Sequence, residues 1–362
     1  GGSIDVIVYS NYKWEISGTS DWCTPSVKGG DANEDGQKVT FSVDVAYDDR
    51  ETTFWFRCAD EKIKFVVSQK SNNVIISYTS SNGKIVIPYD SSAFGATIIS
   101  NTYIDGVGAI EFNAPITSIG DWAFAECESL TSVTIPNSVT EIGERAFADC
   151  SYLTSVNIPD RVTEIRDAVF YECYSLKSVT IPDGVTTIGN YAFYYCYDLT
   201  SVTIPDSVTT IGNNAFYGCR SLESVTIPDS VTTIGEGVFS GCSSLTSVTI
   251  PDSVTTIGEC AFWDCSSLTS VTIPDSVTTI GKQAFKNCSS LTSVTIPDSV
   301  TTIGFQTFQY CSSLTSVYCK ATTPPAVTLD YGYWVAFGYN ASDRKIYVPM
   351  ESVEAYKSAE GW

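Results

Sequence analysis

The chain has 362 residues, of which 20 are Lys or Arg and 41 are Asp or Glu, so its formal net charge is −21. It contains no histidine, which excludes His-dependent catalytic triads and removes the commonest general acid–base side chain and metal ligand. A charge this negative repels phosphate backbones and anionic lipids, and so argues against nucleic-acid binding and against docking on anionic membranes.

Residues 1–71 are predicted to form a small β-sandwich. Apolar and polar residues alternate in four segments, which is the period of a half-buried strand. These segments are residues 4–8, 39–45, 53–57 and 63–67. We therefore expect a separate all-β domain at this end of the chain.

The same region contains the string GGSIDVIVYSNYKWEIS, then Asp21-Trp22, Arg50 before a strand, and Val67-Ser68-Gln69. These features give it a resemblance to a BACON domain. The resemblance implies an immunoglobulin-like module that occurs at the front of surface proteins and is often proposed to bind carbohydrate. Such a module has one more strand before Gly1, so we expect the chain to start inside this domain.

Two features of this domain are open to more than one interpretation. Residues 31–36 match the first half of a calcium loop, but the twelfth position is Ser42, which has no carboxylate to bind the ion; an acidic loop between strands is the alternative. Cys23 and Cys58 are the pair to test for a disulfide, and the sequence leaves that bond open.

Residues 72–109 are predicted to form the N-terminal cap of a repeat region. They read as a hairpin that turns at Ser81-Asn82-Gly83, followed by irregular chain.

From residue 110 to 318 one unit recurs with a period of 23 residues, in about nine copies. Phenylalanine recurs from Phe124 to Phe308, and cysteine comes three residues later from Cys127 to Cys311. The string CSSLTSVTIPDSVTTIG appears three times without change. A strict period this short predicts a solenoid, in which stacked coils bury a continuous core.

Each coil has leucine-rich-repeat spacing, L-x-x-V-x-I, which predicts a short strand that ends at the next proline. The A-F-x-x-C segment reads as one helical or 3₁₀ turn. In the second unit the predicted core positions are Leu130, Val133, Ile135, Val139, Ile142, Phe147 and Cys150. Arg166 replaces a glycine found in the other units, and if that glycine takes positive φ, the third coil bends there.

The unit I-P-x-S-V-T-x-I-G-x-x-A-F-x-x-C-x-x-L-x-S resembles the BspA-like leucine-rich repeats of bacterial surface proteins. Residues 319–362 are predicted to be the closing cap, with one strand and one short amphipathic helix in RKIYVPMESVEAYKSAEGW. The whole chain is thus expected to be mostly β: a small sandwich, then a leucine-rich-repeat solenoid with a strand and a short helical turn per coil and a cap at each end.

Three regular columns of side chains are candidate sites, and each has a structural alternative. The periodic cysteines are expected to be core residues rather than metal ligands or a disulfide ladder, because their Cβ atoms point the same way. The aspartates from Asp160 to Asp298 are expected to cap their own turns rather than hold cations. The Ser and Thr of the outward strand positions are expected to be a solvated face rather than a specific binding surface.

The coils differ most between the Phe and Leu positions, where three successive coils carry aromatic residues. Other coils have Ala or Ser there, so the fold does not require aromatic side chains at these positions. Exposed tyrosines suit protein contacts or stacking on sugars, whereas covering of the coil surface or packing under a cap is the structural alternative. The predicted binding residues are Tyr171, Tyr174, Tyr191, Tyr194, Tyr195, Tyr197, Tyr217 and Arg220.

The family resemblance implies a non-enzymatic surface or secreted protein that adheres to host glycoproteins or matrix proteins. Alternatives are a carbohydrate-binding protein, with the glycan on the sandwich or on the tyrosines, and a passive spacer. We expect no cofactor, no metal, no nucleic acid, no transmembrane segment and a monomer, with a lipid anchor on the outer membrane or secretion as its location. No catalytic motif is present in the sequence.

Overall fold

The computed structural model describes residues 2–10, 12–18, 20, 23–43, 50–59, 61–69, 74–328 and 336–362. It divides into two compact units, Gly1–Val74 with Glu111–Pro115, and Ile75–Ile110 with Ile116–Trp362. Asp21 and Trp22, which contribute to the BACON resemblance, lie outside the described residues.

The first unit contains two antiparallel sheets, as the alternating segments predict. One sheet has the strand order β1-β5-β3 and the other has β4-β2-β6-β7. Trp14, Phe41 and Phe54 are fully buried among its core side chains. The strands are β1 (Gly2–Ser10), β2 (Trp14–Ser17), β3 (Cys23–Pro25), β4 (Gly29–Gly30), β5 (Asn33–Val43), β6 (Arg50–Cys58) and β7 (Glu61–Gln69).

The structure bears on the two features of this unit that the sequence left open. Most of the calcium-loop match lies inside strand β5, which begins at Asn33, so the segment is not the acidic loop predicted from sequence. Cys23 lies in β3 of one sheet and Cys58 in β6 of the other, and no disulfide joins them. The Cys58 Sγ lies 2.9 Å from the Ser10 Oγ instead.

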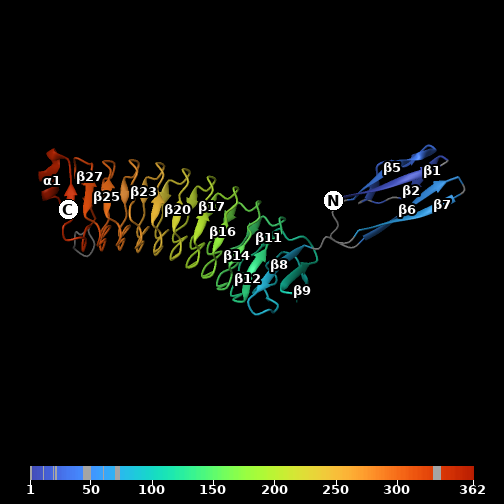
Figure 1. Ribbon diagram of the computed structural model, residues 1–362, viewed down its shortest axis with the longest axis horizontal. Helices are drawn as coiled ribbons and strands as arrows, with labels where there is room; N and C mark the ends of the chain where they lie inside the picture. Colours follow the sequence, from blue (N-terminus) through green and yellow to red (C-terminus); the bar gives the residue numbers. More distant parts are fainter. Residues whose placement is uncertain are drawn as a thin grey trace. The chain divides into compact units, whose positions relative to one another are not determined.

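The second unit is a solenoid whose coils stack through parallel strands (Figure 1). Where these strands pair, a residue meets its equivalent 23 positions later, as Val179 does with Val202. These strands are β12 (Leu130–Thr134), β14 (Ser155–Val156), β16 (Ser178–Thr180), β18 (Ser201–Thr203), β20 (Ser224–Thr226), β22 (Ser247–Thr249), β25 (Ser293–Ile296) and β27 (Ser316–Cys319).

The coils also carry a second, two-residue strand, in most of them at a Thr-Ile or Glu-Ile pair, which was not predicted from the sequence. A further set of bonds joins the turns, as in the Phe147 N–H to the Val169 carbonyl at 2.9 Å. The second strands are β11 (Ser118–Ile119), β13 (Glu141–Ile142), β15 (Glu164–Ile165), β17 (Thr187–Ile188), β19 (Thr210–Ile211), β21 (Thr233–Ile234), β23 (Thr256–Ile257), β24 (Thr279–Ile280), β26 (Thr302–Ile303) and β28 (Ala326–Val327).

The core is the set of columns that the repeat predicts. Leu130, Val133 and Ile135 of the second unit are buried, as are the four other predicted core side chains of that unit. The Phe rings of successive coils are stacked, with centroids 5.1–5.7 Å apart. The stack continues into the C-terminal cap through Phe337, and at the other end Phe94 of the N-terminal cap contacts Phe124 edge to face at 5.4 Å.

The cysteine column fills the core and also forms hydrogen bonds. In eight successive coils the buried thiol donates to the carbonyl of the Phe 26 residues earlier, at 3.0–3.3 Å. The carbonyl of each Phe also accepts the backbone N–H of the Cys three residues later, as at Cys127, so the thiol adds a second bond to it inside the core. Cysteine at this position is a small apolar side chain that also carries a donor.

Burial protects these thiols from alkylation. It raises the pKa of Cys127 to about 11 and of Cys311 to about 12, and the thiolate is the reactive form. We expect iodoacetamide to modify the half-buried Cys58 first in the folded protein, and Cys196 only after unfolding. Mass spectrometry of the labelled peptides measures the order, and modification of Cys196 as fast as Cys58 would contradict it.

The A-F-x-x-C segment is a pair of tight turns, not the helical or 3₁₀ turn predicted from sequence. Its residues make bonds between positions three apart, such as the Ala148 N–H to the Arg145 carbonyl at 3.0 Å. The residues two before and two after each Phe have positive φ, for example 55° at Arg145 and 60° at Asp149. A left-handed residue ends a right-handed helical turn, so the segment cannot propagate as a helix.

This backbone predicts that a glycine at position 149 stabilises the protein relative to alanine. Two other coils already have glycine there, Gly218 and Gly241, with φ of 72°. Because left-handed φ costs an L-residue roughly 1–2 kcal/mol, Asp149→Gly is expected to exceed Asp149→Ala in unfolding free energy by about that amount. Urea unfolding of the pair measures it, and equal stabilities would contradict the assignment.

Glycine recurs at the position before the turns because adjacent coils approach closely there, and not because of a positive φ, which was the reason expected from the sequence. These glycines do not have positive φ. A Cβ added at Gly212 would lie 2.5 Å from the Asn190 nitrogen, so the residue is small because adjacent coils approach closely. Arg166 occupies this column in the third coil, and its guanidinium lies 3.0 Å from Glu141.

The aspartate column does not cap the turns. Among the described residues, the seven carboxylates from Asp160 to Asp298 accept no backbone N–H bond, and only Asp275 has an ionic partner, Lys320 at 3.3 Å. The turn is closed by backbone bonds such as the Val208 N–H to the Pro205 carbonyl at 3.0 Å. Serine ties one coil to the previous one, as in the Ser253 hydroxyl to the Val231 carbonyl at 2.7 Å.

The N-terminal end of the solenoid is closed by strands β8 (Ile75–Ser80), β9 (Ile98–Ile104) and β10 (Val107–Phe112). β8 pairs antiparallel with β12, and the sheet continues to β10 and β9. The predicted turn at residues 81–83 exists, but it leads into extended chain rather than into a second strand. The tight connection lies at Asp105-Gly106, between β9 and β10, where both residues have positive φ.

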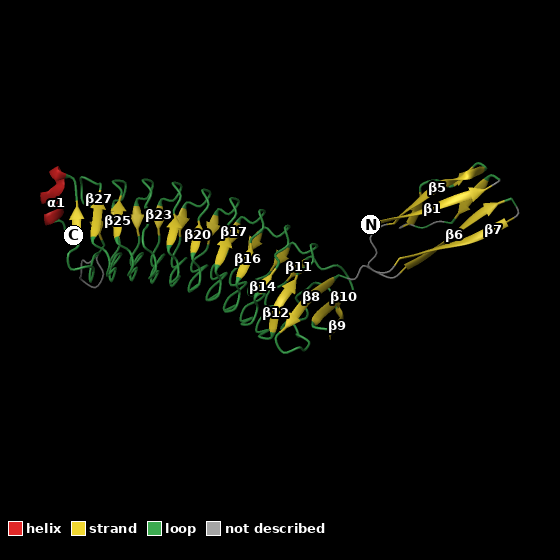
Figure 2. Ribbon diagram, in the orientation of Figure 1, coloured by secondary structure: helices red, strands yellow, loops and turns green. Residues whose placement is uncertain are grey.

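The C-terminal end contains the strand and the helix that the sequence predicts. They are β29 (Lys345–Tyr347), which pairs with β27, and α1 (Val353–Ser358), which comes directly after the 3₁₀ turn η1 (Met350–Ser352) (Figure 2). The Tyr356 hydroxyl donates to the Ala321 carbonyl at 3.0 Å, which fixes the helix on the last coils. No helix in the described residues is long and apolar enough to cross a membrane.

Candidate functional site

The tyrosines predicted to form a binding site stand in two stacked columns in the turns after the Phe positions. In the first column Tyr171 and Tyr194 stack at 5.0 Å with an interplanar angle of 2°, and Tyr194 and Tyr217 stack at 4.9 Å. All three rings are half-buried and lie far along the chain from either cap. The alternative that they pack under a cap is therefore wrong; they pack against one another.

The second column lies three residues further along each coil. Tyr174 and Tyr197 stack at 5.0 Å, and the Arg220 guanidinium lies over the Tyr197 ring at 4.3 Å. The Tyr174 hydroxyl donates to the Glu172 carboxylate. The second column therefore has the exposed Arg220 guanidinium at one end and the Glu172 carboxylate, beside Tyr174, at the other.

Tyr195 joins the two columns into one surface. Its ring lies 4.2 Å from that of Tyr194, 5.2 Å from Tyr197 and 5.5 Å from Tyr217. The space for this ring is left by Gly218, since a Cβ at Gly218 would lie 2.4 Å from the Tyr195 ring. Tyr191 contacts Tyr194 edge to face at 5.5 Å and is 42% exposed. The structure therefore brings all eight predicted residues together, and we call them the tyrosine array.

Two residues that were not selected from the sequence extend the array. The Arg145 guanidinium lies 5.3 Å from the Tyr171 ring and 5.0 Å from the Trp122 ring, so it is held between them. Arg145 and Trp122 occupy the repeat position of Tyr191, two before the Phe. Reading that column as part of the same surface would have identified them.

Burial and neighbouring groups raise the pKa of two tyrosines of the first column, Tyr171 and Tyr194. Burial, and after it the neighbouring Glu172, raises the pKa of Tyr171 to about 12. Burial and the Tyr195 hydroxyl raise the pKa of Tyr194 as well. Burial raises the pKa of the Asp149 carboxyl, and Glu172 and Glu126 add to this effect by like charge. Tyrosine is neutral at pH 7 even with its ordinary pKa of about 10, so these shifts act at alkaline pH.

These shifts predict a loss of stability at alkaline pH. An unfolded tyrosine has a pKa of about 10, so a folded pKa of about 12 means that the folded protein favours the neutral ring. The stabilisation is complete below about pH 10 and falls as pH rises toward 12. We expect Tyr171→Phe to flatten this decline in urea unfolding midpoints measured between pH 9 and pH 12; an unchanged decline would contradict the shift.

Aromatic residues outside the array are also paired. Tyr310 stacks on Tyr339 at 4.7 Å. Tyr318 stacks on Tyr347 at 4.8 Å, and each is 44% exposed. These are single pairs, whereas the array spans three coils with two columns.

The array has the chemistry of a contact surface. It offers ring edges, hydroxyls and guanidinium groups. In the described part of the chain no group of three Cys, Asp or Glu side chains is arranged to hold a metal ion. The central ring of the first column, Tyr194, has both faces covered by neighbouring rings, which leaves its edge and hydroxyl for a ligand.

Comparison with known proteins gives two family matches. The BspA type leucine-rich repeat region matches residues 100–223 and 209–324, in six copies. The BACON model of an N-terminal binding domain matches residues 12–70. No curated protein matches the chain.

Solved structures similar to the chain are bacterial leucine-rich repeat proteins. One from Bacteroides ovatus is 30% identical, with a TM-score of 0.53, over 70% of this chain and 71% of that one. One from T. pallidum is 30% identical, with a TM-score of 0.39, over 52% and 75%. A leucine rich cell surface protein from Faecalibacterium prausnitzii is 26% identical, with a TM-score of 0.36, over 73% and 90%.

Proposed function

The chain belongs to the BspA-type leucine-rich repeat family, and from this premise we propose that it is a non-enzymatic binding protein that adheres to extracellular proteins through the tyrosine array. The observation that carries the proposal is the stacking of tyrosines in three successive coils, at positions where other coils have Ala or Ser. Tyrosine and arginine are enriched among the residues that dominate binding energy at protein interfaces.

The family supports a binding role in general, and the role of the array is our inference. Preordered stacking lowers the conformational entropy that rings lose on binding. The three rings of the first column are neither free in solution nor buried, so a partner meets a rigid surface with hydroxyl donors along it. We propose host glycoproteins or matrix proteins as the partners, and the cell surface with a lipid anchor, or secretion, as the location.

Carbohydrate binding is the second candidate. A sugar stacks on a free aromatic face, and the central faces of the array are covered by other rings. The match of residues 12–70 to a binding-domain family favours the sandwich as the glycan site instead. A passive spacer is the third candidate, and it predicts binding to neither class.

A glycan array and a panel of purified matrix proteins separate these functions. The whole chain and its Tyr171→Ala/Tyr194→Ala/Tyr217→Ala variant are applied to both. Protein adhesion predicts that a matrix protein binds the wild type and that the variant loses this binding. Glycan binding that is equal in both proteins would assign the function to the sandwich, and the absence of any binding would leave the spacer.

A further inference from the structure

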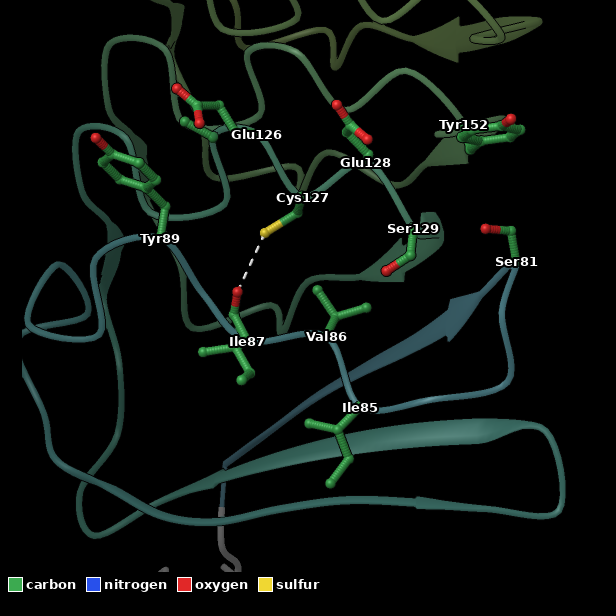
Figure 3. Close-up of a pocket in the computed structure, with 11 residues that line it drawn as sticks. Ser81, Ile85, Val86, Ile87, Tyr89, Glu126, Cys127, Glu128, Ser129 and Tyr152 are labelled. Atoms are coloured by element: carbon green, nitrogen blue, oxygen red, sulfur yellow. Dashed lines mark hydrogen bonds between the residues drawn. The ribbon is translucent and has the colours of Figure 1, made fainter.

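A groove of about 590 Å³ lies where the N-terminal cap meets the first coils (Figure 3). One wall is the cap segment Ile85-Val86-Ile87, and the other is the turn from Ala125 to Ser129. Tyr89 and Tyr152, which are 60% and 57% exposed, also line it. The groove contains none of the eight predicted residues of the tyrosine array.

The cap segment in this groove is extended and behaves as a strand without a partner. Exposure alternates along it, from 47% at Ile85 to 3% at Val86 and 77% at Ile87. The Val86 N–H donates to the Tyr78 hydroxyl at 3.1 Å, and its carbonyl accepts from the Asn101 amide at 2.9 Å. The edge of the segment that faces the protein is therefore fully bonded at Val86.

The opposite edge faces the groove. In an extended chain successive residues direct their N–H and C=O groups to opposite sides, so Ile85 and Ile87 share one side. That side faces the groove, because the Ile87 carbonyl accepts a hydrogen bond at 3.4 Å from the thiol of Cys127, which lies on the opposite wall (Figure 3). Within the described part of the chain the Ile85 N–H, the Ile85 carbonyl and the Ile87 N–H form no hydrogen bond.

The charges of the groove are all of one sign. Glu126 and Glu128 line it, and none of its lining residues is Lys or Arg. The net charge of −21 adds to this local field and steers cations toward the surface. Exposed apolar side chains, Ile85 and Ile87, lie beside the two carboxylates.

We propose that this groove binds an extended peptide segment that alternates apolar and basic side chains. The peptide adds as a strand to the outer edge of residues 85–87, where the three unbonded backbone groups pair with its main chain. Its Lys or Arg side chains meet Glu126 and Glu128, and its apolar side chains cover Ile85 and Ile87. This site goes beyond the function proposed for the tyrosine array and does not depend on it.

The test uses the whole chain and a fluorescein-labelled peptide of four Lys-Val repeats, with binding measured by fluorescence anisotropy. Two matched probes separate the contributions: the same peptide with every internal amide N-methylated keeps the charge but lacks main-chain donors, and a Glu-Val peptide reverses the charge. We expect saturable binding of the first peptide and at least about tenfold weaker binding of the other two.

Protein variants locate the site. Glu126→Gln/Glu128→Gln is expected to weaken binding of the Lys-Val peptide at least about tenfold, whereas Glu223→Gln, an exposed carboxylate in another coil, changes nothing. Ile87→Pro removes one groove-facing donor and is expected to weaken binding, with Ile87→Val as its control. Equal binding of the N-methylated peptide, or of the double Gln variant, would overturn the proposal. The triple Ala variant of the array is expected to bind this peptide normally.

Discussion

Phe216→Ala is expected to lower the unfolding free energy by about 3–5 kcal/mol, the range for removal of a buried phenylalanine. The ring is fully buried and stacks on Phe193 at 5.1 Å and on Phe239 at 5.6 Å. In a solenoid each coil is stabilised by its neighbours, so a cavity in a central coil weakens two interfaces at once. The measurement is the shift of the urea midpoint, with the slope compared because repeat arrays can unfold in parts.

The adjacent residue supplies the control. Tyr217 comes directly after Phe216 in the chain but points into the half-buried surface column rather than the core. Tyr217→Ser reproduces the side chain that the next coil has at Ser240, and we expect it to cost less than about 1 kcal/mol. A loss below about 1 kcal/mol for Phe216→Ala, or equal losses for the two variants, would contradict the assignment of the Phe column as the core.

Tyr171→Ser/Tyr194→Ser/Tyr217→Ser is expected to abolish binding while the fold is kept. Residues that dominate an interface contribute at least about 2 kcal/mol each, so loss of such a cluster weakens binding at least about thirtyfold. The matched control is Tyr318→Ser/Tyr347→Ser, which removes an exposed stacked pair from another part of the solenoid. Binding is measured by surface plasmon resonance against the matrix protein selected by the panel.

The repeat made most of the solenoid predictable from the sequence. A residue that recurs every 23 positions meets its own copy in the next coil, so a core position in one unit is a core position in all. This is why the Phe, Leu and Cys columns were identified correctly without a structure. The tyrosine columns came from the same register, and the structure brings their rings within 5.0 Å of one another.

The features that the sequence did not reveal depend on backbone geometry. The letters A-F-x-x-C are compatible with a helical turn, and only the positive φ values on both sides of the Phe exclude it. The glycine column looked like a conformational requirement, whereas it reflects the distance between coils. The aspartates after proline looked like turn caps, whereas the adjacent serines make the bonds, as Ser253 does.

The two caps of the solenoid were the least predictable part, because their sequences do not follow the 23-residue repeat. Phe337 continues the core stack 29 residues after Phe308, so a search at 23 residues misses it. The hairpin at Asp105-Gly106 has a recognisable turn signal, but the expected hairpin was placed at Gly83 instead. The extended segment at residues 85–87 carries no motif, and its unbonded edge appears only when its neighbours are known.

The most direct test of the tyrosine array is the affinity ratio between the wild type and the triple Ser variant for the selected matrix protein, measured on samples with matched urea midpoints. A binding role for the array predicts a ratio of at least about thirty, with the Tyr318→Ser/Tyr347→Ser control within about twofold of the wild type. Equal affinities for the wild type and the triple variant, at equal stability, would contradict the claim that the tyrosine array is the binding surface.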